Sequence, residues 1–250
     1  MYTMIQNFFK AAIFIVLVYA CNPNNVKNDT AIAQLMDSAG MQGNFALLEN
    51  GTEQFTIHNL SNYKDSAAAP LNTFFIIPVL IGLDKGIINH HDTTLNLNDS
   101  AELYKAVIAK IGRQQILKVL DSLHYGKGIA SADSTHFWED GSLVITPDEQ
   151  LGLIKRIYFK ELFFQKKSQE KIKKMILMED NSNYRLSYIT GIDTTAGKNT
   201  AWVLGYVEEN QHPYFFVLNT KSNTSTNLTD NNINLLKKIL LQQGFLKGTR

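Results

Sequence analysis

Apolar and polar positions alternate along the chain in patterns that predict both strands and helices. In residues 43–58, two runs of strand-forming residues flank Asn50-Gly51, a dipeptide that strongly indicates a β-hairpin. A polar link at residues 59–69 follows, and apolar side chains then fill almost every position of residues 72–84. A helix that is apolar nearly all round belongs at the centre of a domain, and Asn72 is a suitable residue to cap its amino end.

Helical and alternating periodicities continue to the end of the chain. We expect helices at residues 31–38, 101–112, 116–123, 146–157, 166–176 and 233–241, and strands at residues 184–191, 200–208 and 214–219. Thr146, Pro147 and Glu149 have the spacing of a capping box, which indicates a helix start. The segment at 166–174 is rich in lysine, and we interpret it as a solvated helix face rather than an anion site.

The amino-terminal residues have the pattern of a signal peptide. Lys10 precedes an apolar run at residues 11–18 that is too short to cross a bilayer. Tyr19-Ala20-Cys21 resembles a lipobox, with Tyr19 as a bulky departure, and the alternative is a cleaved signal with an incidental cysteine. Cys21 is the only cysteine, which excludes internal disulfides and favours lipidation. We therefore expect a signal peptide at 1–20, a lipidated Cys21 with a tether at 21–36, and one domain at 37–247.

Composition limits the function classes. The 250 residues are 44% hydrophobic and 19% charged, with a formal net charge of +1, as in an ordinary globular domain with one sizeable core. A charge near zero provides no field that would attract nucleic acid. Together with the expected lipid on Cys21, this predicts a lipid-anchored protein of the bacterial cell envelope that faces the periplasm.

Several short motifs occur in a recognisable order. Pro70-Leu71-Asn72-Thr73-Phe74-Phe75 resembles the Pro-Ala-Ser-Thr-Phe-Lys segment that opens the active-site helix of class D β-lactamases, which are related to penicillin-binding transpeptidases. Further matches are Tyr125-Gly126-Lys127 (family Tyr-Gly-Asn), Phe137-Trp138-x-x-Gly141 (family Phe-Trp-x-x-Gly) and Ile189-Thr190-Gly191 (family Lys-Thr-Gly). The resemblance covers roughly residues 43–243. It implies an α/β (α+β) fold with an antiparallel sheet flanked by a helical region and terminal helices.

The resemblance also shows which chemistry has changed. The family acylates its motif serine, uses the following lysine as general base, and holds the substrate carboxylate with the lysine of Lys-Thr-Gly. Asn72, Phe75 and Ile189 stand at these three positions. Loss of a serine nucleophile alone reduces turnover by about a millionfold. The sequence thus predicts a pseudoenzyme with no intact catalytic residue and with no metal or cofactor.

The six positions equivalent to the family site are Asn72, Phe75, Trp138, Ile189, Thr190 and Gly191. Because Phe75, Trp138 and Ile189 are apolar, we expect the cleft to have collapsed into core, with Phe75 packed against Trp138. The alternative is a site remodelled for an apolar or partner-borne group.

Two other groups of residues were considered as functional sites and are less convincing. His90-His91-Asp92 is interpreted as a solvated turn rather than a metal site, since adjacent residues on an extended chain point apart. Counting back from Tyr104, the serine of the family's Ser-x-Val motif falls on Asp99, and Ser100 is one place away.

Three functional hypotheses follow. The first is a non-catalytic binding or scaffold module of the cell wall, whose partner is a peptidoglycan fragment, a β-lactam or another envelope protein, and not nucleic acid. The second is a β-lactam-acylated protein or hydrolase that uses a displaced hydroxyl such as Ser66, Thr73 or Ser100. The third is a β-lactam sensor domain, which also depends on serine acylation.

Overall fold

A computed structural model describes residues 25–99, 101–127, 136–197 and 199–250. The expected signal peptide, Cys21 and Ser100 lie outside these residues. Seven strands form one sheet in the order β1-β3-β2-β7-β6-β5-β4, and each neighbouring pair is antiparallel except β1 and β3. The strands are β1 (Val26–Asn28), β2 (Met41–Glu49), β3 (Gln54–His58), β4 (Leu177–Asp180), β5 (Arg185–Asp193), β6 (Thr200–Glu209) and β7 (His212–Ser222).

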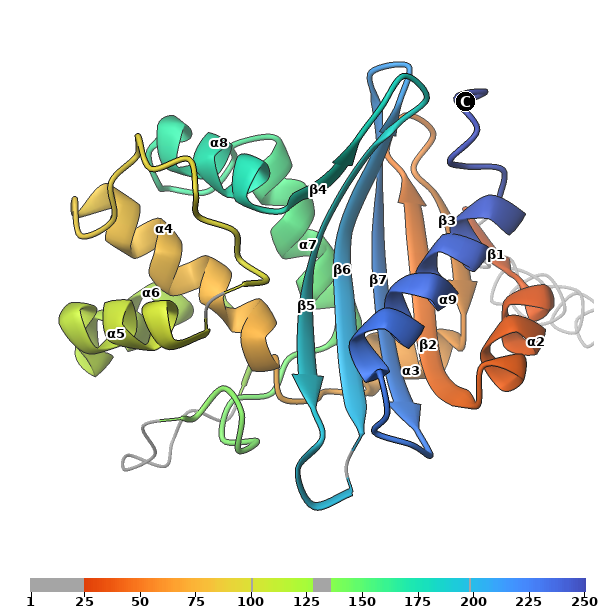
Figure 1. Cartoon of the computed structure of the whole chain (residues 1–250), viewed down its shortest axis with the longest axis horizontal. Helices are drawn as coiled ribbons and strands as arrows, with labels where there is room; N and C mark the ends of the chain where they lie inside the picture. The colour runs from red at the N-terminus through yellow and green to blue at the C-terminus, as the bar shows by residue number, and fades with distance from the viewer. Residues whose placement is uncertain (1–24, 100, 128–135, 198) are drawn as a thin grey trace, which may run out of the picture.

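Helices cover both faces of this sheet (Figure 1). They are α2 (Thr30–Ser38), α3 (Leu60–Asp65), α4 (Ile76–Asp84), α5 (Ala101–Ile111), α6 (Arg113–Leu123), α7 (Pro147–Tyr158), α8 (Lys166–Met175) and α9 (Leu228–Gln242), with short 3-10 helices η1 (Leu71–Phe75) and η2 (Thr195–Gly197). Helices α2 and α9 pack on one face and share a hydrophobic core with it. The remaining α-helices and η1 belong to the larger core on the opposite face. The expected mixed fold is confirmed.

Local sequence signals placed most elements correctly. The hairpin of β2 and β3 is present, and because Glu49 pairs with Gln54, its loop comprises residues 50–53. The capping box is also present: Thr146 Oγ1 accepts from the Glu149 N–H, and the Glu149 carboxylate accepts from the Thr146 N–H. The polar link at 59–69 contains the short helix α3, in which Tyr63 is buried.

The predicted tether is wrong for residues 26–36. Strand β1 extends the sheet beside β3, and α2 buries Ile32 and Met36 against the sheet. The Asp29 carboxylate caps α2 by accepting from the Ala31 N–H at 2.9 Å and accepts from Gln243 Nε2 of α9 at 2.9 Å. These contacts make the segment part of the domain.

The carboxyl-terminal boundary at residue 247 is also too early. The carboxylate of Glu209, which is 1% exposed, accepts hydrogen bonds from the N–H groups of Leu246, Thr249 and Arg250. These bonds hold the last residues on the end of β6, so the domain continues to residue 250. Within the described ranges, no helix is long and apolar enough to span a membrane.

Candidate functional site

The segment with the altered nucleophile motif forms η1, which leads directly into α4. Asn72 lies inside η1, where its side chain is partly exposed. The prediction that Asn72 caps the helix is wrong, since α4 starts at Ile76 and neither η1 nor α4 has a side-chain cap. Leu71 adopts a left-handed φ of 54° and donates its N–H to the Trp138 carbonyl at 2.9 Å. A non-glycine residue in this region is uncommon, so tertiary contacts hold Leu71 there.

Phe75 occupies the position of the family's first lysine and is part of the core. Its side chain is 1% exposed, and its ring centroid lies 5.4 Å from that of Tyr104 and 6.1 Å from that of Trp138. Trp138 is itself 1% exposed and stacks on Phe74 at 5.3 Å. The contact between Phe75 and Trp138 that the sequence predicted is therefore present, and it fills this position with aromatic rings.

Ile189 occupies the position of the second lysine and is 0% exposed. It belongs to the same hydrophobic cluster as Phe75 and Trp138. Two positions that carry charge in the resembling family thus add to one apolar core. Collapse of the site, which the sequence analysis favoured, agrees with this burial at Phe75 and Ile189.

Thr73 has its hydroxyl committed to buried hydrogen bonds. Its Oγ1 donates to the Pro70 carbonyl at 2.5 Å and accepts from Gln150 Nε2 at 2.8 Å. The Gln150 Oε1 in turn accepts from the Tyr125 hydroxyl at 3.5 Å, and burial raises the pKa of that phenol. Thr73 and Gln150 are both 0% exposed, so the Thr73 hydroxyl serves packing rather than attack on a ligand.

Ser66, another candidate for a displaced nucleophilic hydroxyl, does not lie in η1. It follows the last residue of α3 and is exposed. Neither Thr73 nor Ser66 has a described hydrogen bond to an imidazole, amine or carboxylate that would act as its base.

The end of β5 approaches η1 closely through Gly191. A Cβ atom added there would lie 3.0 Å from the Pro70 carbonyl oxygen, 3.1 Å from Leu71 Cβ and 3.2 Å from the Asn72 nitrogen. Any larger residue would be tight at this contact between β5 and η1, so glycine is favoured there. The structure thus brings together Asn72 and Gly191.

Asn98 is a site residue that the sequence analysis did not identify. Its Oδ1 accepts from the Thr190 N–H at 2.8 Å and from Thr190 Oγ1 at 3.0 Å, and its Nδ2 donates to the Tyr188 carbonyl at 3.0 Å. A carboxamide has the donor and acceptor of a peptide group, so it can replace a neighbouring strand along this part of β5. Counting residues back from Tyr104 had pointed to Asp99 and Ser100, whereas Asn98 is the residue whose side chain bonds to β5.

Tyr104 supports the loop that carries Asn98. Its hydroxyl donates to the Asn96 carbonyl at 2.8 Å. Burial, together with the negative charges of Asp99 and Asp92, raises the pKa of Tyr104 to about 12. The phenol is therefore a neutral hydrogen-bond donor at physiological pH.

Metal-ligating side chains do not cluster in the described part of the chain. No group of three or more His, Cys, Asp or Glu residues there has the geometry to hold a metal ion. His90, His91 and Asp92 lie in a turn in which the His91 N–H donates to Asn89 Oδ1 and the Thr94 N–H donates to Asp92 Oδ1.

Comparison with known proteins identifies the family. Residues 96–241, more than half of the chain, match the profile of the penicillin binding protein transpeptidase domain. The fold and site define a domain of the β-lactamase and transpeptidase class, and the chain belongs to the penicillin-binding protein transpeptidase domain family. The match includes Asn98 and β5 and begins after η1.

Curated relatives include both a regulator and an enzyme. The chain is 28% identical over 204 residues to regulatory protein BlaR1 of Bacillus licheniformis, a match to 73% of this chain and 34% of that protein. It is 26% identical over 208 residues to β-lactamase OXA-48 of Klebsiella pneumoniae, covering 75% and 78%. The chain thus spans about a third of BlaR1.

Solved structures share the fold. The class D β-lactamase YbXI from Nostoc superposes with a TM-score of 0.77 at 24% identity, covering 86% of this chain and 99% of that one. The C-terminal domain of the Bacillus licheniformis BlaR penicillin-receptor gives 0.78 at 23% identity, covering 90% and 98%. The predicted β-lactamase and transpeptidase-like fold is therefore confirmed.

Proposed function

We propose that this protein is a non-acylating penicillin-binding or β-lactamase-like domain that acts as a binding or scaffold module in the bacterial envelope. The observation that carries the proposal is the buried Phe75 at the position of the general base, beside Asn72 at the position of the nucleophile.

Acyl transfer to this fold needs a nucleophile and a group that takes its proton. The Asn72 carboxamide has no proton that a base removes near neutral pH, and the Phe75 ring has no lone pair. Phe75 is 1% exposed between Tyr104 and Trp138, so the position of the base is filled by an apolar ring. Loss of the serine alone costs about a millionfold in turnover.

The partner that we propose is a peptidoglycan fragment, a β-lactam or another envelope protein. One structure with this fold is the domain of a penicillin-receptor, which supports a binding role for the present chain. Thr190 and Gly191 lie near the end of β5, and Gly191 closely approaches η1, which supports a backbone frame like that of the family site.

We further propose that residues 1–20 are a signal peptide and that a lipid on Cys21 holds the domain at the periplasmic face of a membrane. Because the sheet already begins at Val26, the chain from Cys21 to Val26 spans at most about 18 Å when fully extended. The domain would therefore remain close to the bilayer.

Intact-mass spectrometry after incubation with excess penicillin tests the proposal. We expect an unchanged mass, and we expect no β-lactam hydrolysis in a turnover assay on the same sample. A mass increased by one penicillin, or measurable hydrolysis, would contradict the proposal and favour a protein that is acylated on a displaced hydroxyl. Peptide mapping would then identify the acylated residue, with Ser66, Thr73 and Ser100 as the first candidates.

A further inference from the structure

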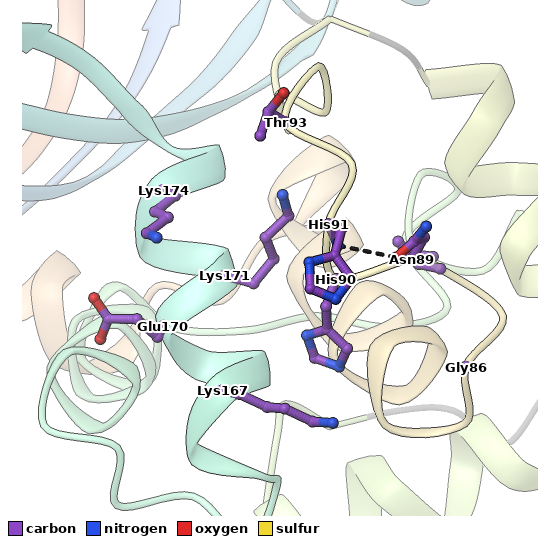
Figure 2. Close-up of a pocket in the computed structure, with 10 residues that line it drawn as sticks. Gly86, Asn89, His90, His91, Thr93, Lys167, Glu170, Lys171 and Lys174 are labelled. Carbon is purple, nitrogen blue, oxygen red and sulfur yellow. Dashed lines mark hydrogen bonds between the residues drawn. The ribbon is translucent and has the colours of Figure 1, made fainter.

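Three lysines of α8 line a cavity of about 820 Å³ between this helix and the loop that follows α4. Figure 2 shows that the ammonium groups of Lys167, Lys171 and Lys174 point in different directions, so they do not converge on one ligand. Lys171 is 8% exposed and donates to the Asp92 carbonyl. The segment directly after α8 has a more specific arrangement.

Met178 is the additional residue of a β-bulge in β4. Leu177 lies opposite Ser187 on β5. Glu179 lies opposite Leu186, the preceding residue of β5, so Met178 has no opposite position of its own. Bulges redirect a side chain from the regular alternation of a strand. Here the Met178 sulfur lies beside the loop that follows α4, which Figure 1 shows running back to β5.

Two carboxamides of that loop donate to the Met178 sulfur. Asn98 Nδ2 lies 3.5 Å from Sδ, and Asn96 Nδ2 lies 3.6 Å from it. Since an amide nitrogen carries two hydrogens, Asn98 Nδ2 also donates to the Tyr188 carbonyl at 3.0 Å. Asn98 Oδ1 accepts from the Thr190 N–H at 2.8 Å. Asn98 therefore joins the sulfur to the edge of β5.

Met178 is also the most accessible of the described methionines. It is 36% exposed, whereas Met36, Met41 and Met175 are each 2% exposed or less. A thioether sulfur is a weak acceptor, so its hydrogen bonds to the carboxamides open easily and do not protect it from an oxidant. Because an oxidant must reach the sulfur, Met178 should react first among these four residues.

We propose that Met178 is a site of oxidative modification by a peroxide and that its sulfoxide releases Asn98 from β5. With hydrogen peroxide, a sulfur lone pair attacks one oxygen, the S–O bond forms as the O–O bond breaks, and proton transfer releases water. The sulfur loses two electrons, and these reduce the peroxide. The product is a polar and chiral side chain that methionine sulfoxide reductases convert back to methionine.

The space between Met178 and Asn98 is too small for the added oxygen. The 3.5 Å from Sδ to Nδ2 would have to contain a covalent S–O bond and an N–H···O contact of about 2.9 Å. The 3.6 Å to Asn96 Nδ2 has the same limit, so an oxygen on either side displaces a carboxamide. The sulfoxide oxygen is also a stronger acceptor than the thioether, and it competes with the Tyr188 carbonyl for the Asn98 N–H groups. Both effects weaken the hold of Asn98 on β5.

The modification acts on the candidate site through β5. This strand continues from Thr190 to Gly191, which closely approaches η1 at Asn72. Release of Asn98 therefore loosens the strand edge that leads into the site. This consequence rests on the proposed function of the site, whereas the oxidation of Met178 and the release of Asn98 do not.

Peroxide treatment of the full-length protein in detergent tests the modification. Fragment-ion mass spectrometry should detect an added oxygen on Met178 at least about tenfold faster than on Met175, an internal control three residues earlier that is 1% exposed and reacts only when the core opens. Amide hydrogen exchange at Thr190 should then accelerate by at least about fivefold. Methionine sulfoxide reductases of both epimer specificities should restore slow exchange, with dithiothreitol oxidised to its disulfide and the oxygen released as water.

Two variants show whether the effect passes through these residues. Met178→Leu keeps a similar apolar volume without the sulfur, so its exchange at Thr190 should not respond to peroxide. In Asn98→Ala, oxidation of Met178 should cause no further acceleration, because the group that the sulfoxide displaces is already absent.

Equal oxidation rates at Met178 and Met175 would overturn the proposal. Unchanged exchange at Thr190 after oxidation of Met178, or an equal response to peroxide in Met178→Leu, would also overturn it. These readouts are separate from the penicillin experiment, because neither the oxidation nor the exchange measurement depends on acylation.

Discussion

The ring of Phe75 lies 6.1 Å from the ring of Trp138, at an interplanar angle of 63°, and both side chains are 1% exposed. This edge-on pair joins the start of α4 to the Phe-Trp-x-x-Gly segment, two motifs far apart in the sequence. Aromatic pairs of this geometry contribute about 0.5–1.5 kcal/mol beyond the area that they bury. The altered motif therefore has a structural role of its own.

Replacement of Phe75 by the family's lysine should destabilise the domain. Phe75→Lys removes a buried ring, which alone costs about 3–5 kcal/mol, and places an ammonium group among Phe74, Tyr104 and Trp138. We expect the free energy of unfolding in urea to fall by more than about 3 kcal/mol. Phe163→Lys is the control, because Phe163 is 59% exposed and should tolerate the change. Equal stability of the two variants would mean that Phe75 faces an open cleft.

Restoration of the serine alone should not restore acylation. In Asn72→Ser the new hydroxyl would have no general base, since Phe75 and Ile189 remain buried and apolar. We expect the intact mass of Asn72→Ser to be unchanged after incubation with excess penicillin. The native chain serves as the reference on the same instrument. An acyl adduct in the variant would show that another group near η1 acts as the base.

The elements that the sequence predicted depend on local signals. The β2–β3 hairpin and the capping box at Thr146 and Glu149 are encoded within a few residues. The order of motifs around Phe75 and Trp138 was sufficient for the fold, because each motif is a short local run of residues.

Features that the sequence analysis missed depend on contacts between distant residues. Asn98 and Thr190 are 92 positions apart, and no periodicity indicates that a carboxamide will pair with β5. The docking of α2 was missed because the helical pattern of this short segment does not say what it packs against, and only the sheet reveals that Ile32 and Met36 are buried.

Gly191 should be sensitive to a single methyl group. Gly191→Ala would bring Cβ to 3.0 Å from the Pro70 carbonyl oxygen and 3.2 Å from the Asn72 nitrogen, and backbone atoms yield poorly. We expect a loss of about 1–3 kcal/mol in unfolding free energy, as for other overpacked sites. Gly152→Ala is the matched control, because it lies within α7 with no atom within 4 Å of the added Cβ. It should stabilise the protein by up to about 1 kcal/mol.

The Asn98 carboxamide should protect the edge of β5. Asn98→Ala leaves the Thr190 N–H and the Tyr188 carbonyl without their partners, at about 1–3 kcal/mol for each group that stays buried. We expect amide hydrogen exchange at Thr190 to accelerate by at least about tenfold. Exchange at Val203, which lies opposite Thr190 on β6, should change much less because the β5–β6 ladder remains. Unchanged exchange at Thr190 would show that Asn98 does not hold this edge.

Asp29, which caps α2, should make the stability of the domain depend on pH in the acid range. The hydrogen bond from Gln243 Nε2, together with the Ala31 N–H and the Lys27 ammonium, holds the pKa of Asp29 below its usual value. A depressed folded-state pKa stabilises the native state above the unfolded value of about 3.9, and this contribution is lost as the pH falls through the folded pKa.

Asp29→Asn tests this linkage, because asparagine retains the capping oxygen and removes only the charge. We expect the variant to be less stable than the native protein at pH 7 and to lose less stability between pH 5 and about pH 2, as measured by urea unfolding at each pH. Gln243→Leu should reduce the same slope, because it removes the largest cause of the lowered pKa at Asp29. Parallel stability curves for the native protein and Asp29→Asn would show that the contact between α2 and α9 does not depend on the charge of Asp29.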